Sequence, residues 1–285
     1  MTLTFKDSKI NAHFQIIYGS DGFNRKYFTQ NKNDQLLTIA WNKGDTQKVV
    51  VDEVTYDFPA NAILPLVANQ TFRFENAEAI VAWQFNRDFY CIIDHDEEVS
   101  CVGFLFYGSS QAMFILPDKK EEDKINMLLK VFKDEFETSD AIQGEMLRML
   151  LVRLIITITR LAKKQYIGTQ NEEENTKFNL YREYNIMVEK NYRTHHEVQY
   201  YASALNKSPK TLANVFALYG KKTPLQIIQE RLASEAKRLL YYTDKSVKEI
   251  AAEIGFEDTS HFSRFFKKQT SLTPTEFKNS IKNTQ

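Results

Sequence analysis

The chain has 285 residues, of which 43% are apolar and 26% are charged, and its formal net charge is zero. A chain of this length can form two domains with a good core, and its composition is ordinary for a soluble globular protein. Two cysteines, Cys91 and Cys101, are too few for a disulfide scaffold. With no signal-peptide pattern at its start, the sequence predicts a cytoplasmic protein.

The charge is unevenly distributed along the chain. Residues 1–176 contain 19 Lys+Arg and 26 Asp+Glu, whereas residues 177–285 contain 18 and 11. The N-terminal part therefore has a net charge of −7 and the C-terminal part +7. A basic C-terminal part behind an acidic one is typical of a nucleic-acid-binding module joined to something else.

Residues 12–116 show the pattern of short β-strands. β-branched and aromatic residues dominate, and Gly, Asn and Asp interrupt them at short intervals, as in a β-sandwich or small barrel. Asp52-Glu53 is expected to form the turn of a hairpin. The expected strands are HFQIIYG, LLTIAW, QKVVVDEVTYDF, AILPL, FRFEN, AIVAWQF, FYCIID and VGFLFY.

Residues 119–166 change to apolar spacings of three and four, which predict two amphipathic helices with a break near 138–140. Arginines interrupt the most apolar run, so a membrane span is not expected. The second helix has more apolar residues than one buried face needs, the additional ones being Leu147, Leu151 and Ile156. This surplus favours contact with a second copy of the chain. Packing wholly within the monomer is the alternative.

Residues 167–176 are polar and acidic and are interpreted as an interdomain linker.

The basic part, residues 177–285, carries one pattern twice. After a leading helix around 180–192, residues 196–219 and 246–269 each predict a helix-turn-helix motif, and from Ser208 the two align at a constant offset of 50 residues. Three capping boxes mark helix starts, two of them followed by proline. A helix from Pro224 to about Tyr242 is expected between the motifs. The capping boxes are Thr223-x-x-Gln226, Ser246-x-x-Glu249 and Thr273-x-x-Glu276.

The second copy, KEIAAEIGFEDTSHFSRFFKKQTSLTPTEFK at 248–278, carries a family resemblance. The patterns I-A-x-x-x-G-F, S-x-F-x-R-x-F-K-K and T-P-x-x-F closely resemble the signature of AraC/XylS-type transcriptional regulators. The family usually has Gly where Ser271 stands and Arg where Lys278 stands. In the first copy, Gly220 falls one position early, and Lys221 occupies the usual glycine site.

This resemblance implies an α+β multidomain protein. Residues 1–118 are expected to form a cupin-like antiparallel β-barrel that acts as a sensor, and residues 119–166 a helical hairpin for dimerisation. Residues 177–285 then form an all-α domain of two helix-turn-helix motifs that bind the major groove of double-stranded DNA. A homodimer, a small-molecule effector and contact with the transcription machinery are further implied, without a cofactor or membrane partner.

The helical period separates groove-facing from core-facing residues in each recognition helix. Arg264 is the best candidate for base readout, because its guanidinium can bond two acceptors on guanine, and Asn214 could do the same for adenine. The lysines are expected to contact phosphate. The predicted DNA-binding residues are Lys210, Thr211, Asn214, Lys221, Lys222, Thr259, Ser260, His261, Arg264, Lys267 and Lys268.

The predicted barrel could hold a ligand or consist only of core and surface residues. Its candidate ligand-binding residues are Trp41, Arg73, Trp83, Phe85 and Arg87. No metal is expected, because only His13 and His95 fall in this region and no H-x-H pattern occurs. This argues against an enzyme, namely a cupin with a nucleic-acid tether. A second alternative is a regulator without ligand sensing, controlled by its abundance or by a protein partner.

Overall fold

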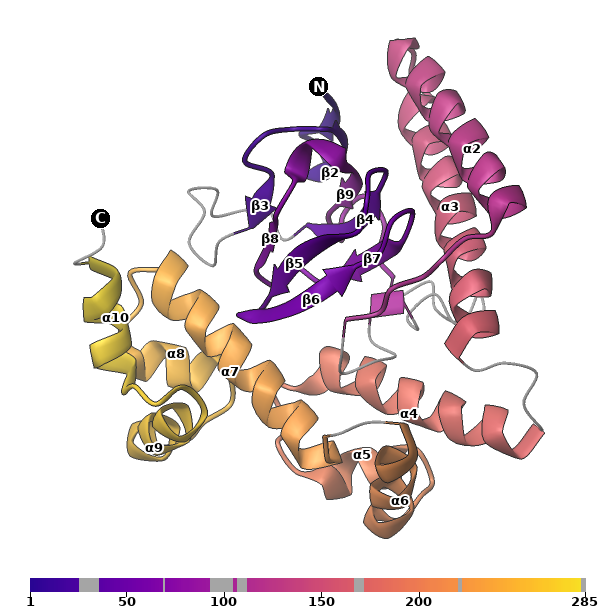
Figure 1. Cartoon of the computed structure of the whole chain (residues 1–285). Helices are drawn as coiled ribbons and strands as arrows, with labels where there is room; N and C mark the ends of the chain where they lie inside the picture. The colour runs from indigo at the N-terminus through magenta and orange to yellow at the C-terminus, as the bar shows by residue number, and fades with distance from the viewer. Residues whose placement is uncertain are drawn as a thin grey trace. The chain divides into compact units, whose positions relative to one another are not determined.

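The computed structural model describes residues 1–25, 36–68, 70–92, 105–106, 112–166, 172–219 and 222–282. The chain divides into two compact units, an N-terminal unit Met1–Asn171 and a C-terminal unit Glu172–Gln285 (Figure 1).

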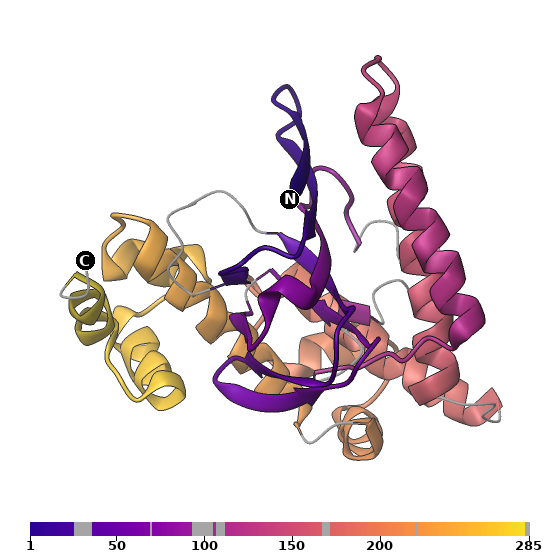
Figure 2. The same cartoon turned by 45° about the horizontal axis from the view of Figure 1, so that its top comes forward.

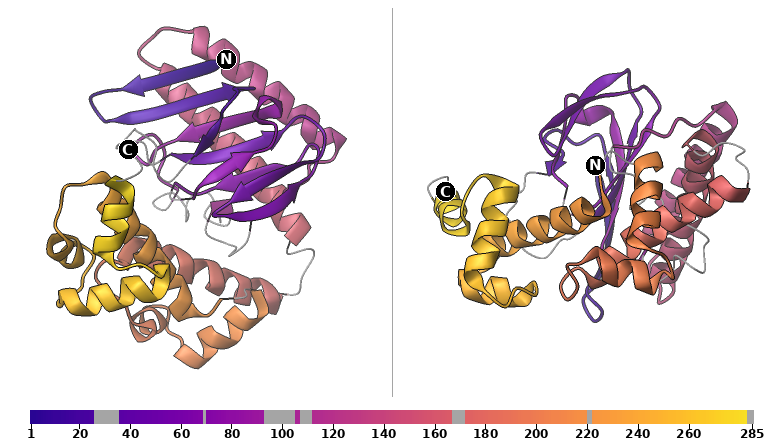
Figure 3. Two further views of the ribbon diagram at one scale, coloured as in Figure 1. Left: turned by 60° about the vertical axis from the view of Figure 1, so that its left-hand side comes forward. Right: turned by 90° about the horizontal axis from the view of Figure 1, so that it is seen from below.

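The described strands of the N-terminal unit form two antiparallel sheets (Figure 3). One sheet has the order β1-β2-β9-β4-β7 and the other β3-β8-β5-β6. The strands are β1 (Thr2–Asp7), β2 (Ala12–Tyr18), β3 (Asn24–Arg25), β4 (Leu37–Asn42), β5 (Gln47–Val51), β6 (Val54–Phe58), β7 (Ile63–Leu66), β8 (Phe72–Phe74) and β9 (Ile80–Phe85). The antiparallel β-domain is thus present, but the described strands do not close into a barrel, and the cupin-like assignment is not confirmed.

Alternate residues of the strands form the core between the two sheets. Ala40 and Ala82 of the five-stranded sheet share one apolar cluster with Val49, Phe58 and Phe74 of the four-stranded sheet. Successive side chains of a strand point to opposite faces, so their neighbours in sequence must face away from this cluster. That alternation determines on which face of each sheet the predicted ligand-binding residues lie.

Local turns explain why one predicted hairpin forms and why one predicted strand does not. The hairpin of β5 and β6 turns at Asp52 and Glu53, whose φ angles of 47° and 68° are those of a tight hairpin turn. In the expected strand at 89–94, residues 89–92 form no strand, because the Asn86 side chain accepts a hydrogen bond from the Phe89 amide and turns the backbone, and residues 93–94 lie outside the described residues. In the expected strand at 102–107, residues 105–106 are helical and the others lie outside the described residues.

Two helices, α2 (Lys119–Glu137) and α3 (Gln143–Tyr166), form the predicted hairpin (Figure 2). The hairpin packs on the five-stranded sheet through Phe132, whose ring lies 5.6 Å from Phe14 and 6.5 Å from Trp83. Leu147 and Leu151 are fully buried, so their expected availability to a second chain is wrong. None of the helices within the described ranges combines the length and hydropathy that a membrane crossing needs.

The C-terminal unit contains the two helix-turn-helix motifs at the predicted positions (Figure 1). Its first helix begins at Glu172, so residues 172–176 of the predicted linker are helical, since glutamate is a good helix former. The helices are α4 (Glu172–Asn191), α5 (Val198–Ala204), α6 (Pro209–Tyr219), α7 (Pro224–Tyr242), α8 (Val247–Glu253), α9 (Thr259–Thr270) and α10 (Pro274–Lys282).

All three predicted capping boxes form. In each, the hydroxyl accepts from the amide three residues on, and the Gln or Glu side chain accepts from the first amide in return. Ser271 ends α9 with a left-handed φ of 65°, the conformation that glycine adopts most easily. Lys278 donates to the carbonyl of Lys245 at 2.8 Å. Both positions of the second copy that depart from the family pattern, Ser271 and Lys278, therefore have defined structural roles.

Candidate nucleic-acid interface

The second recognition helix, α9, presents a polar and basic face. Asp258 starts it by accepting hydrogen bonds from the amides of Ser260 and His261, and these bonds hold the pKa of Asp258 below its usual range. Phe262 and Phe266 are fully buried on the inner side. The outer residues Ser260, His261, Arg264, Lys267 and Lys268 are all exposed, and Thr259 is half-buried.

The three cations of this face are electrostatically available. Arg264, Lys267 and Lys268 form no ion pair with any residue that the structure describes. Their positive charges therefore remain exposed to solvent in the folded protein. An unpaired guanidinium on an exposed helix face can form two parallel hydrogen bonds to one acceptor pair, while the ammonium groups act as point charges.

The first recognition helix, α6, presents fewer exposed side chains that are free to contact DNA. Lys210 and Asn214 are exposed, but the Thr211 hydroxyl lies 2.9 Å from the hydroxyl of Ser208, which caps the helix. Lys222 is paired with Glu230 at 2.7 Å. Lys221 lies outside the described residues. Of the predicted contacts in the first motif, Lys210 and Asn214 are the ones that the described structure leaves both exposed and uncommitted.

The predicted ligand-binding residues do not come together. Trp41, Trp83 and Phe85 are fully buried on the face of the five-stranded sheet that packs against α2, because Ala40 and Ala82 take the inter-sheet side. Arg73 is exposed, and it lies between two buried phenylalanines of β8, so it points away from the space between the sheets. Arg87 is exposed beyond the end of β9. These five residues therefore do not line one pocket between the sheets.

Metal-binding side chains are dispersed. Within the described ranges, no group of three or more His, Cys, Asp or Glu side chains could hold a metal ion. His13 and Cys91 are buried, whereas His95 and Cys101 lie outside the described residues.

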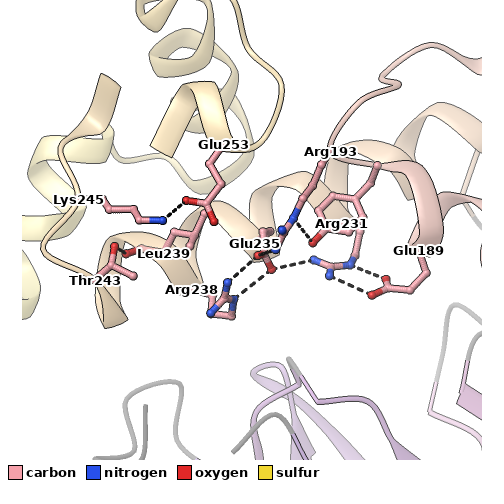
Figure 4. Close-up of polar contacts among 10 residues, drawn as sticks. Glu189, Arg193, Arg231, Glu235, Arg238, Leu239, Thr243, Lys245 and Glu253 are labelled. Atoms are coloured by element: carbon pink, nitrogen blue, oxygen red, sulfur yellow. Dashed lines mark hydrogen bonds and ion pairs between the residues drawn. The ribbon is translucent and has the colours of Figure 1, made fainter. Parts of the chain in front are cut away.

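An ion-pair network behind the recognition helices was not predicted from sequence. Glu235 of α7 is 1% exposed and contacts the guanidinium groups of Arg193, Arg231 and Arg238 (Figure 4). Arg231 also forms two hydrogen bonds to Glu189 of α4. The spacing of Arg231, Glu235 and Arg238 places all three on one helix face, and this is the signal that the sequence offered.

Burial and the neighbouring charges shift the pKa of the central carboxylate, that of Glu235, in opposite directions. Burial by itself would raise the pKa of Glu235, but hydrogen bonds from Arg238 and the charges of the arginines outweigh it and hold that pKa at about 2. The network therefore contains an ionised, desolvated carboxylate at neutral pH.

Comparison with known proteins identifies the C-terminal part. Residues 201–280 match a family model described as a helix-turn-helix domain. The chain is 39% identical over 74 residues to the xylose operon regulatory protein of Haemophilus influenzae, covering 26% of this chain and 19% of that protein. It is 31% identical over 85 residues to the arabinose operon regulatory protein of Salmonella typhimurium, covering 30% of each.

Among solved structures, ToxT from Vibrio cholerae O395 matches with a TM-score of 0.42 and 15% identity, over 99% of this chain and 97% of that chain. The chain spans about half, or less, of the length of the curated relatives it matches. These relatives are transcriptional regulators and not enzymes, as expected from the sequence. The C-terminal helix-turn-helix domain of this chain is thus similar to the domains of AraC-type transcriptional regulators.

Proposed function

We propose that this protein is a cytoplasmic, sequence-specific transcriptional regulator that binds the major groove of double-stranded DNA through α6 and α9. The observation that carries the proposal is the outer face of α9, where Arg264, Lys267 and Lys268 are exposed without an ion-pair partner among the described residues. A helix-turn-helix places such a face against base edges and phosphates.

The linking helix supports a binding mode that uses both motifs. Helix α7 has 19 residues, which corresponds to about 28 Å. One turn of DNA is about 34 Å, so recognition helices held at this scale are suited to successive major grooves on one side of the duplex. In this proposal α9 reads most of the sequence, while Lys210 and Asn214 of α6 add alignment and fewer base contacts.

Selection of DNA fragments from a random pool by the purified full-length chain tests this function. A regulator of this kind should enrich one site with two sub-sites about one helical turn apart. Enrichment of no sequence above the input pool, at salt concentrations where nonspecific binding is weak, would contradict sequence-specific recognition.

Lys267→Ala is expected to weaken binding to all sequences alike, because a lysine on phosphate contributes affinity without reading bases. The slope of log K against log salt should become less steep by about 1. Titrations of specific and random duplexes at several salt concentrations measure both effects. Lys9→Ala, at an exposed turn of the N-terminal unit, removes the same charge and should leave the slope unchanged.

For the N-terminal unit we propose a sensor formed by residues 1–118, a dimerising hairpin at 119–166 and a linker shortened to 167–171. The twelve-residue apolar cluster between the sheets gives residues 1–118 a core of their own.

A metabolite screen by thermal shift of the full chain distinguishes control by a small-molecule effector from control without ligand sensing. A compound that raises the unfolding temperature supports an effector, whereas a screen without any shift favours control by abundance or by a protein partner.

The dimer proposal rests on the outer face of the hairpin. Met127 and Met149 are 69% and 65% exposed, and Val131 and Met146 are also exposed. Methionine is enriched at interfaces between proteins, and exposed apolar side chains are suited to a contact surface. A groove of about 600 Å³ runs along the same hairpin and is lined by Asp118, Glu121, Lys124, Met149, Val152, Arg153, Ile156, Thr157, Arg160, Leu161 and Lys164.

Met149→Asp is expected to convert the dimer into a monomer, because it introduces an unpaired charge into an apolar interface. Sedimentation of the full chain at micromolar concentration measures the change. Val54→Asp places the same charge on an equally apolar, 51% exposed site of β6 and should leave the dimer intact. A monomeric wild type, or a Met149→Asp variant that remains dimeric, would contradict this interface.

A further inference from the structure

The short loop between α4 and α5, residues Arg193–His196, contacts three other parts of the C-terminal unit. It stands directly before the first helix-turn-helix motif, to which it is bound by the Tyr201 hydroxyl, 2.8 Å from the carbonyl of His195. The rings of His195 and Tyr200 stack at 3.5 Å. The loop is therefore fixed to α5 and moves with the first motif.

The same loop also contacts the turn of the second motif. The Nε2 atom of His196 donates to the carbonyl of Ile254 at 2.9 Å, since a carbonyl can only accept. The His196 ring lies 4.8 Å from that of Phe256. Ile254 and Phe256 flank the turn glycine and come only a few residues before α9. The His196 side chain, which precedes the first motif, thus binds the turn that leads into the second recognition helix.

Gly255 shows how close this contact is. A Cβ atom at this position would lie 2.0 Å from the carbonyl oxygen of Arg193, and the φ of Gly255 is +83°. Glycine is required both by the left-handed backbone and by the approach of the loop. The contact is therefore between two backbones, which have far less freedom to adjust than long surface side chains.

The side chain of Arg193 connects the loop to the linking helix as well. It donates to Glu235 at 2.6 Å and to the Tyr192 hydroxyl at 3.0 Å, and Glu235 is held in turn by Arg231 and Arg238 of α7 (Figure 4). The loop thus connects the two motifs in addition to α7 and to the apolar core that they share. Such an additional polar connection restricts rotation of one motif relative to the other.

We propose that Arg193 and His196 are positioning residues, which contact no base but fix α9 relative to α6 and so set the spacing between the two DNA sub-sites that the protein accepts. This inference rests on the proposed function and adds a source of specificity to it. The loop acts through geometry, so its loss should change the accepted spacing rather than the accepted bases.

The test uses the full-length protein and duplexes that carry the selected site with the distance between its sub-sites changed by one base pair in either direction. Wild type should lose affinity by about tenfold for each change, equivalent to about 1.4 kcal/mol. His196→Ala should lose no more than about threefold, because the second motif is free to follow the altered spacing. His196→Gln keeps a side-chain N–H donor and should restore part of the discrimination.

Hydrogen exchange provides a readout that does not depend on DNA. In His196→Ala, the amides of residues 254–262 should exchange faster, whereas those of α6 should not. Arg193→Ala is a second variant that releases the loop from Glu235 and should broaden the spacing preference in the same way.

Unchanged spacing preference in both His196→Ala and Arg193→Ala, with only a uniform loss of affinity or stability, would overturn the positioning role while leaving the proposed function intact. A wild type that enriches no DNA contradicts the proposed function itself, and the inference falls with it.

Discussion

Glu235→Gln is expected to destabilise the C-terminal unit by about 3–5 kcal/mol, because it removes the charge that compensates three arginines in a largely buried network. The lowered pKa of Glu235, about 2 against 4.5 for an unperturbed glutamate, agrees in direction, because the arginines favour the ionised carboxylate. The expected loss is among the largest effects that a single side chain should have in this unit.

The same network predicts a dependence on pH. Since folding lowers the pKa of Glu235, its contribution to stability is complete above about pH 4.5 and disappears as the pH falls toward 2. Wild type should therefore lose stability across this interval, and Glu235→Gln should lose less, because glutamine does not titrate. At pH 2 the stabilities of the two proteins should converge.

Urea unfolding of the full chain measures both effects with an internal control. The two tryptophans, Trp41 and Trp83, lie in the N-terminal unit, so their fluorescence reports that unit alone. Helical circular dichroism should show an earlier transition in Glu235→Gln, with the fluorescence transition unchanged. Glu230→Gln, at an exposed ion pair on the same helix, should change stability by no more than about 0.5 kcal/mol. Equal losses in the two variants would refute the special role of Glu235.

Arg264→Ala is expected to weaken binding to the selected DNA site by about 1–3 kcal/mol and to relax specificity at one base position. The reason is that Arg264 is exposed on the outer face of α9 without an ion-pair partner among the described residues, which leaves two parallel N–H donors of its guanidinium for a guanine. Because the fully buried Phe262 and Phe266 fix the helix from its inner side, the fold should be unaffected.

Titration against a panel of duplexes, each with one base changed, locates that position. Arg264→Lys keeps the charge but not the planar pair of donors, so it should recover nonspecific affinity without recovering discrimination. Equal losses of Arg264→Ala on specific and random duplexes would assign Arg264 to phosphate contact instead.

The C-terminal unit was the more predictable of the two from sequence. Capping boxes at Thr223, Ser246 and Thr273 are local signals, because all their partners lie within four residues, and the helices begin where these signals stand. The exposed and buried faces of α9 follow from the helical period in the same way. Helix-turn-helix motifs are therefore encoded in short stretches of the chain.

The N-terminal unit was less predictable because strands depend on partners distant in sequence. Strand β1 was not predicted, and it forms by pairing Thr2–Asp7 with β2. Which aromatic residues face the second sheet and which face α2 is decided by strand register, since a shift of one residue exchanges the two faces. Register is what places the candidate ligand-binding residues Trp41 and Trp83 on the face of the sheet toward α2, and the sequence does not specify this register locally.

The sequence by itself determined the two basic helix-turn-helix motifs, their order and the residues that each recognition helix turns outward, because these follow from contacts within one or two helical turns. Only the tertiary structure decided that Lys222 is paired, that Glu235 holds three arginines, and that the loop before α5 touches the turn at Gly255. The pairs of Glu235 with Arg231 and Arg238 are local, four and three positions apart, but the other contacts join residues about 8 to 60 positions apart, and no local pattern specifies them. The relation between the two motifs is therefore a property of the folded unit, although each motif can be read from its own residues.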